Sequence, residues 1–366
     1  MKWSRRSAGR VVPALALALL LSACSSSPPD ADSAADEGQD VGSDAEEDVE
    51  EPEDAAEDDD AQEDAAGTDG WSFTDDRGVT VTLDEAPTSI AAYAEAGGAL
   101  IRYGITPVGM FGASPIESDP LFEGYDITSV ESFGATYGEV EIEKMIAADV
   151  DLIVSTIFAD PASDLSQAVV RGFNDLEQQA QFEDVAPIVG INAATDARTA
   201  LERMADLAEA LGADLESEEF TTDRAEFDEA SEELEAAAAE ESLTVMAISV
   251  FGEQIYVAQP SDYADLSYYQ ELGVDVLEPD TDDAFWEALS YEQADKYHAD
   301  VIIYDDRPFA SPIDELLAVP TFGGLPAVEA EQLGPWRGPA TPLHFGAYAE
   351  NLRMHAELFS AAQPLS

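Results

Sequence analysis

A short pattern of polar and apolar positions occurs twice in the chain. In residues 143–154 and again in residues 292–303, a glutamate opens a short helical segment and, eight residues later, an aspartate introduces an entirely apolar strand. A helix that leads into an apolar, β-branched strand is typical of a parallel sheet covered on both faces. Two such units so far apart predict two α/β lobes rather than a tandem repeat array.

The positions around the first copy predict the rest of an N-terminal lobe over residues 71–194. Residues 73–83 alternate between apolar and polar side chains around an Asp-Arg-Gly turn, as in a β-hairpin. Short apolar strands follow, with a helix between the first two, at residues 87–92, 107–110 and 185–189.

Residues 195–240 have a different pattern. Apolar positions recur at helical spacing, Thr195 is the expected N-cap, and no strand pattern interrupts the alanine-rich and acidic sequence. We expect a long helical connector here, followed by a second α/β lobe over residues 241–366 that begins with an apolar strand and ends with a helix.

The N-terminus has the features of a lipoprotein signal peptide over residues 1–23. Four basic residues precede an apolar run at residues 11–21, which is too short for a comfortable membrane span. The sequence from Leu21 to Cys24 resembles a bacterial lipobox, so we expect lipid attachment to Cys24 and an extracytoplasmic, membrane-anchored protein. Arg5 and Arg6 leave open whether export follows the general or the twin-arginine route.

The net charge and the cysteine content exclude some partners and one way of stabilising the fold. The chain has a formal net charge of −64, which argues against nucleic acid as a partner. Cys24 is the only cysteine, so a disulfide framework is excluded. Residues 24–70 lack large apolar side chains and basic residues almost entirely, and we expect a disordered acidic tether.

Several landmarks fall in one order along residues 71–366. They are the Asp-Arg-Gly hairpin, a Pro-x-x-Ile strand, Gly-x-x-Pro-Val-Gly, the glutamate-led helix before Asp-Leu-Ile-Val, a helical connector, and a second glutamate-led unit. In this order the chain resembles the iron-siderophore and cobalamin branch of the substrate-binding proteins of ABC importers. It departs from the usual pattern at Val150 and Ala299, where that family has a proline before the aspartate.

The resemblance implies two Rossmann-like α/β lobes joined by the connector, with the ligand in a cleft between them. Ligands of open α/β sheets lie outside the carboxyl ends of the strands, so the candidate residues are those in the loops after strands. The first lobe offers Tyr93, Glu95, Phe111, Ser114, Thr156 and Phe158, and the second offers Phe251, Tyr256, Tyr263, Phe285, Trp286, Tyr304, Arg307, Trp336, Arg337 and His344.

Aromatic rings form broad apolar walls, and the planar guanidinium of arginine suits carboxylate or metal-bound anionic oxygens. Arg307 and Arg337 are favoured because cations are scarce, although Arg307 has the alternative of pairing with Asp305 or Asp306. We expect nine residues to contact the ligand: Tyr93, Phe111, Thr156, Phe251, Trp286, Tyr304, Arg307, Trp336 and Arg337.

The resemblance also implies partners. One glutamate on each lobe of such proteins docks with arginines of the permease, and by motif these are Glu143 and Glu292. We expect a monomer without a cofactor or resident metal, which captures a ferric siderophore-type chelate and delivers it to an ABC permease with its ATPase.

Other functions remain open at this stage. Haem or a corrinoid is an alternative ligand, with a tyrosine or His344 as a contact, and an envelope adhesin or sensor is an alternative use of the same fold. A bare divalent metal is disfavoured because the chain has three scattered histidines. An enzyme is disfavoured because no Gly-x-Ser-x-Gly elbow or zinc-binding helix occurs.

Overall fold

The computed structural model describes residues 70–160, 163–240, 242–308 and 310–365. The signal peptide, Cys24 and the acidic tether predicted from the sequence lie outside these residues. No helix among the described residues is both long and apolar enough to span a membrane.

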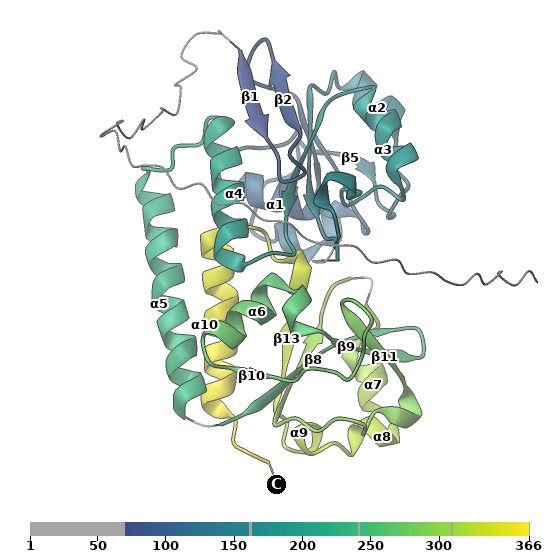
Figure 1. The fold of residues 1–366 in the computed structure, drawn as a ribbon, viewed down its shortest axis with the longest axis vertical. Coiled ribbons are helices and arrows are strands. Elements are labelled where there is room, and N and C mark those ends of the chain that lie inside the picture. The colour runs from purple at the N-terminus through teal and green to yellow at the C-terminus, as the bar shows by residue number, and fades with distance from the viewer. Residues whose placement is uncertain (1–69, 161–162, 241, 309, 366) are drawn as a thin grey trace, which may run out of the picture. The chain divides into compact units, whose positions relative to one another are not determined.

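The N-terminal lobe combines a hairpin with a parallel sheet and three short helices (Figure 1). Its elements are β1 (Trp71–Thr74), β2 (Thr80–Leu83), β3 (Ile90–Tyr93), α1 (Ala94–Arg102), β4 (Gly109–Phe111), β5 (Glu131–Gly134), α2 (Ile142–Ala147), β6 (Leu152–Ile157), α3 (Leu176–Glu183) and β7 (Ile188–Asn192). The sheet order is β5-β4-β3-β6-β7, and every pair in it is parallel. From β3 the chain adds strands on one side of the sheet (β4, β5) and then on the other (β6, β7). The boundary between β3 and β6 is therefore the topological switch point of a doubly wound sheet.

The predicted hairpin is present, and its Asp-Arg-Gly turn joins it to the parallel sheet. Arg77 donates to Asp75 through Nε at 2.8 Å and to the carbonyl of Ile188 at 2.7 Å, while the Gly190 amide donates to Asp75 at 3.0 Å. Both charged side chains are buried. The ion pair thus satisfies backbone groups of β7 that would otherwise be exposed at the edge of the sheet.

The C-terminal lobe is a mixed sheet covered by helices. Its elements are β8 (Thr244–Phe251), β9 (Gln254–Ala258), α6 (Ala264–Glu271), β10 (Asp275–Val276), β11 (Trp286–Ser290), β12 (Val301–Asp305), α7 (Ile313–Leu317), α8 (Pro320–Gly323), α9 (Pro326–Glu329), β13 (Leu333–Trp336) and α10 (Phe345–Ala361). The order is β11-β9-β8-β12-β13, with β10 beside β8. Strands β10, β12 and β13 follow the parallel pattern, whereas β9 pairs with β8 in an antiparallel hairpin.

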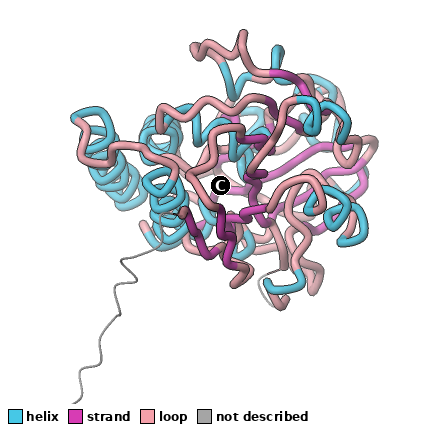
Figure 2. Tube along the Cα trace, turned by 90° about the horizontal axis from the view of Figure 1, so that it is seen from above, coloured by secondary structure: helices cyan, strands magenta, loops and turns pink. Residues whose placement is uncertain are grey.

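The predicted connector consists of two helices, α4 (Ala197–Ala210) and α5 (Glu218–Glu240). Asp196, and not the expected Thr195, caps α4 by accepting from the Thr199 amide at 2.8 Å. Helix α5 does not stand alone: Figures 1 and 2 show it side by side with α10. Phe227 of α5 is fully buried and contacts Phe345 at a ring distance of 5.4 Å, so the connector is part of the hydrophobic core.

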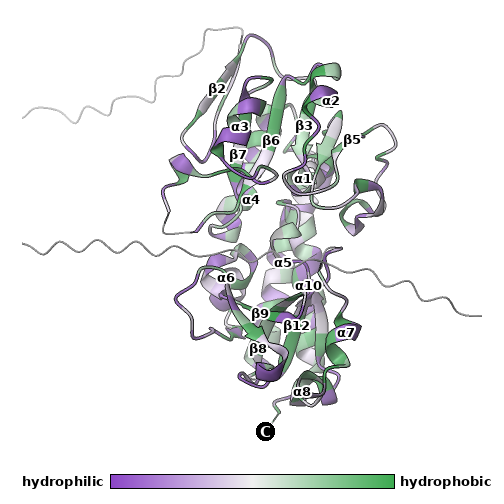
Figure 3. Ribbon diagram, turned by 90° about the vertical axis from the view of Figure 1, so that its right-hand side faces the viewer, coloured by the Kyte–Doolittle hydropathy of each residue, from purple (hydrophilic) through white to green (hydrophobic). Residues whose placement is uncertain are grey.

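The two copies of the repeated pattern differ in their helical part. The first copy forms α2, whereas the second forms a three-residue 3₁₀ turn (Tyr291–Gln293) with a capping box between Ser290 and Gln293. Both copies lead into central parallel strands, β6 and β12, as predicted. These strands are coloured mainly as hydrophobic in Figure 3, and nearly all of their residues are buried. Both features are expected of parallel strands in a sheet that is covered on both faces.

Candidate functional site

The carboxyl ends of β3 and β6 meet at the switch point of the N-terminal sheet. Tyr93 ends β3 and Glu95 lies in the first turn of α1, while Phe158 directly follows β6. Thr156, inside β6, is 2% exposed, and its hydroxyl has no hydrogen-bond partner among the described residues. Tyr93, Glu95, Thr156 and Phe158, all predicted from the sequence, thus lie at or near the carboxyl ends of two adjacent parallel strands.

Arg171 completes this floor of the N-terminal lobe. Its guanidinium pairs with Glu95 at 3.2 Å and stacks over the rings of Tyr93 and Phe158 at 5.2 and 5.7 Å from their centroids. Burial raises the pKa of the Glu95 carboxyl, and the charges of Arg171 and Arg307 oppose that shift. The second carboxylate oxygen of Glu95, Oε2, is buried and has no hydrogen-bond partner within the described ranges.

The C-terminal lobe contributes Arg307, which follows β12. It donates to Asp305 from Nε at 2.8 Å and from Nη2 at 2.6 Å, and Ser249 donates to the same carboxylate at 2.8 Å. The side chains of Arg307 and Asp305 are 10% and 1% exposed. Arg307 is therefore ion-paired with Asp305, and it also lines a small pocket together with Glu95.

Arg337 lies beside this pair and is more exposed. It approaches Asp306 at 3.6 Å with 45% of its side chain exposed. Burial raises the pKa of Asp306, whereas Arg337 lowers it. Two neighbouring small pockets, each of about 20 Å³, lie between these loops and the loop of residues 112–121, with Asp119 in the wall of both.

An aromatic cluster lies across the two lobes. We define it as Phe158 from the N-terminal lobe and Tyr263, Phe285, Trp286 and Trp336 from the C-terminal lobe. Phe158 stacks on Phe285 at a centroid distance of 4.6 Å and lies 5.4 Å from Tyr263. Tyr263 lies 5.2 Å from Trp286 and 5.3 Å from Trp336, so Phe158 closes the cleft by inserting its ring against the other lobe.

Phe285 is held in an unusual backbone conformation. Its φ is +70°, which is a rare value for an aromatic residue. Hydrogen bonds on both sides enforce it: the Phe285 amide donates to Asp262 at 2.7 Å, and its carbonyl accepts from the Gln259 amide at 2.8 Å. Strain of this kind costs about 1–3 kcal/mol and is concentrated at functional sites.

Trp336 has a buried support. Its indole Nε1 donates to Asp265 at 2.6 Å, and burial raises the pKa of that carboxyl while this hydrogen bond opposes the shift. On the far side of β13, His355 bonds Tyr269 through Nδ1 at 2.7 Å and the Pro335 carbonyl through Nε2 at 3.0 Å. Burial lowers the pKa of His355 to about 4, so the ring is neutral and positions the strand.

Some of the predicted residues lie elsewhere. Phe251 is the last residue of β8 and is 62% exposed. Tyr304 lies within β12 and packs against the core cluster that contains Leu316, and Phe111 is a buried neighbour of Tyr93 at 5.7 Å. Neither Phe251 nor Tyr304 makes a ring contact with the aromatic cluster among the described residues: Phe251 points into solvent and Tyr304 packs on the core.

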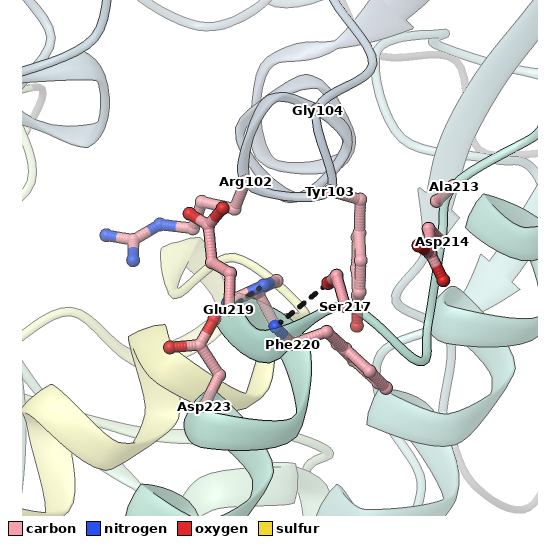
Figure 4. Close-up of a pocket in the computed structure, with 10 residues that line it drawn as sticks. Arg102, Tyr103, Gly104, Ala213, Asp214, Ser217, Glu219, Phe220 and Asp223 are labelled. Atoms are coloured by element: carbon pink, nitrogen blue, oxygen red, sulfur yellow. Dashed lines mark hydrogen bonds and ion pairs between the residues drawn. The ribbon is translucent and has the colours of Figure 1, made fainter.

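His344 belongs to a separate pocket at the other end of α1, shown in Figure 4. It caps α10 by accepting from the Gly346 amide, and its ring contacts that of Tyr103 at 4.6 Å. Burial lowers the pKa of His344 to about 3. The structure therefore places His344, the alternative contact for haem or a corrinoid, away from Glu95 and Arg307. No group of three potential metal ligands is assembled within residues 70–160, 163–240, 242–308 and 310–365.

The comparisons with known proteins agree with this geometry. A protein-family model described as "Periplasmic binding protein" matches residues 132–337 of the chain. The chain belongs to the periplasmic binding protein family. Members of this family are substrate-binding components of transporters and are not enzymes, and their place of action is extracytoplasmic.

Solved structures of two siderophore-binding proteins and of an iron uptake ABC transporter substrate-binding protein are similar to this periplasmic binding protein. DesE, a ferric-siderophore receptor protein from Streptomyces coelicolor, is 32% identical over 81% of this chain and 100% of its own, with a TM-score of 0.75. A siderophore-binding protein from the fuscachelin gene cluster of Thermobifida fusca shares 21% identity over 75% of this chain and 96% of its own, with a TM-score of 0.56. PiuA of Streptococcus pneumoniae shares 16% identity over 79% of this chain and 98% of its own, with a TM-score of 0.60. The last two show the fold alone. No curated protein matches the chain.

Arg171 is the site residue of this binding protein that the sequence pattern missed. It lies 14 residues after β6, in a loop whose path does not follow from periodicity. The signal was available in the composition: Arg171 is the only cation between Lys144 and Arg198. In such an acidic chain, an isolated arginine is expected to form an ion pair with a carboxylate, as Arg171 does with Glu95.

The two arginine pairs of the C-terminal lobe predict contrasting effects on stability. Asp305→Asn leaves the buried Arg307 without its carboxylate and should lower the free energy of unfolding by about 3–5 kcal/mol. Asp306→Asn, at the next position, breaks a half-exposed pair and should cost about 0–1 kcal/mol. Urea denaturation of both variants measures the difference, and equal losses would contradict the assignment of Asp305–Arg307 as the buried pair.

Proposed function

We propose that this protein captures a ferric siderophore-type chelate between its lobes and delivers it to an ABC permease. The proposal is supported by the likeness to a ferric-siderophore receptor protein at 32% identity. The observation that carries it is the composition of the cleft, where an aromatic cluster lies beside the buried guanidinium groups of Arg171 and Arg307. Such a chelate combines an apolar ligand backbone with polar, metal-bound oxygens, so it needs both kinds of wall.

Binding requires the lobes to separate. The two small pockets between the loops are each about 20 Å³, whereas a typical small-molecule site encloses roughly 300–1,000 Å³. The ring contact between Phe158 and Phe285 occupies the space between the lobes. A chelate therefore enters after this contact opens, and the aromatic rings then become available to the ligand.

Tryptophan fluorescence should report chelate binding. We expect a panel of ferric siderophore complexes to include one that binds with about micromolar affinity or better, roughly 8 kcal/mol, and quenches the emission. Trp286→Phe combined with Trp336→Phe should lose most of the quenching because both tryptophans lie in the aromatic cluster. Trp71→Phe, in the hairpin, is the matched control and should retain it. Absence of binding by every ferric chelate, haem and corrinoid tested would refute the ligand class.

Delivery is proposed to use Glu143 and Glu292. Glu143 lies in the first turn of α2 and Glu292 in the 3₁₀ turn before β12, and both are exposed. A helix start alone favours an acid there through its dipole, yet the same acid at the same offset in both lobes is not required for that. Two exposed carboxylates on rigid lobes suit paired arginines of a two-fold permease and provide orientation more than affinity.

Reversing both charges should separate docking from ligand binding. The variant Glu143→Arg with Glu292→Arg should keep chelate affinity but abolish uptake and permease-stimulated ATP hydrolysis. The control is Glu177→Arg with Glu271→Arg, which makes the same charge change at other exposed glutamates. If the docking assignment is wrong, the double variant transports at the wild-type rate.

The anchor is proposed from the lipobox at Cys24. Lipid on its thiol would hold the protein at the outer face of the cytoplasmic membrane. Replacement Cys24→Ser should release the protein from washed membranes into the soluble fraction, as measured by immunoblotting, with Cys24 unchanged in the control. Equal membrane retention of both proteins would show that the lipid is not the anchor.

A further inference from the structure

The cations of the cleft are all matched by carboxylates. Arg171 pairs with Glu95, Arg307 with Asp305, and Arg337 with Asp306. Asp119 adds a further carboxylate to the walls of both small pockets. The site therefore holds three guanidinium groups against four acidic side chains, and its fixed charge does not favour an anion.

The Arg307 pair shows why this balance matters for a ligand. Two of its hydrogen bonds go to the same carboxylate, which is itself 1% exposed. A fork–fork pair of this kind fixes the plane of the guanidinium and cancels its charge locally. Arg307 is thus suited to orienting neutral oxygen acceptors and poorly suited to compensating the net charge of an anionic complex, whose burial here would be costly.

Glu95 offers the ligand an acceptor. Its side chain is 9% exposed, and only one of its oxygens, Oε1, contacts Arg171. The other oxygen, Oε2, is buried without a hydrogen-bond partner in the part of the chain that the structure describes. Glu95 lines the same pocket as Arg307, so its carboxyl group lies at the cleft. An ionised carboxylate accepts hydrogen bonds only, so a donor group satisfies it.

We propose that the cleft selects ferric chelates without net negative charge, and that Glu95 Oε2 accepts a hydrogen bond from an N–H or ammonium group of the chelate. This inference rests on the proposed function. Three singly charged hydroxamates cancel the charge of Fe³⁺, whereas three doubly charged catecholates leave a triply negative complex. The charged side chains of the cleft can therefore distinguish chelates by their net charge, because the carboxylates repel an anionic complex and attract a cationic one.

The experiment uses one chelate scaffold at three charges. A linear tris-hydroxamate with a terminal primary amine is tested as its ferric complex, with the amine free, acetylated or succinylated, which gives net charges of plus one, zero and minus one. Calorimetry with the full-length protein in detergent measures each dissociation constant. The cationic complex should bind roughly 10- to 100-fold more tightly than the anionic one.

Glu95→Gln tests the residue. It should weaken the cationic complex by about tenfold, strengthen the anionic complex and change the neutral complex least, because attraction is lost for the first and repulsion is relieved for the second. Glu350→Gln is the matched control, because Glu350 also pairs with an arginine, Arg102, but lies in α10. Circular dichroism melting checks that both variants fold, and the wild-type charge series does not depend on either of them.

Each outcome decides the matter. Equal or tighter binding of the anionic complex by the wild-type protein overturns charge selection, and an equal loss for all three complexes in Glu95→Gln overturns the role of Glu95. If the series fails but a triply negative ferric tris-catecholate binds, the proposed function stands and this inference falls. If no ferric chelate binds, both fall.

Discussion

In both lobes, the central strands run parallel (β3 and β6 in one, β8, β12 and β13 in the other), so their carboxyl ends meet at one edge of each sheet. The backbone hydrogen bonds of the sheet end there, and the chain must turn into a loop or a helix. Tyr93 with Glu95, Phe158, Arg307 and Trp336 all lie within two residues of such an end. The site depends on strand direction first, because residues far apart in the chain come together only through it.

Scarcity of positive charge is the second physical theme. The chain has 15 lysines and arginines against 79 acids, so repulsion is the default interaction on its surface. Some of the cations within the described residues pair with carboxylates that would otherwise be buried alone, whereas others, such as Arg353, pair with exposed acids. Arg77 supports the hairpin, Arg307 is held by Asp305, and Arg171 pairs with Glu95. A buried acid without such a partner would shift its pKa and lose its charge.

The lobes meet through rings as well as through helices. Phe158 reaches from one sheet to Phe285 of the other, and the backbone of Phe285 is held at positive φ to receive it. Helices α5 and α10 pack together through Phe227 and Phe345, which gives the connector its own core. A contact of a few aromatic side chains can open while the helix pair stays intact, because far less apolar surface is exposed by the first change than by the second.

The sequence by itself determined the fold class, since the period of apolar residues distinguishes buried parallel strands from helices. It also predicted that cleft residues lie at the ends of strands: Tyr93 and Trp336 end β3 and β13 and Arg307 follows β12, whereas Trp286 begins β11. Local chemistry was enough for the Asp-Arg-Gly hairpin and for the Ser290–Gln293 capping box, because both are made by neighbours in sequence.

Tertiary structure alone decided the rest. Arg171 enters the site through a loop without periodicity, and Tyr304 faces the core cluster because alternation along β12 is fixed only by the neighbouring helices. His344 resembled a ligand contact by residue type, but its place at the start of α10 puts it at the opposite end of α1 from Glu95. Which arginine pairs with which carboxylate is also decided by the distance between the side chains in the folded protein. The energy of an ion pair depends on that distance and on burial, and not on sequence separation.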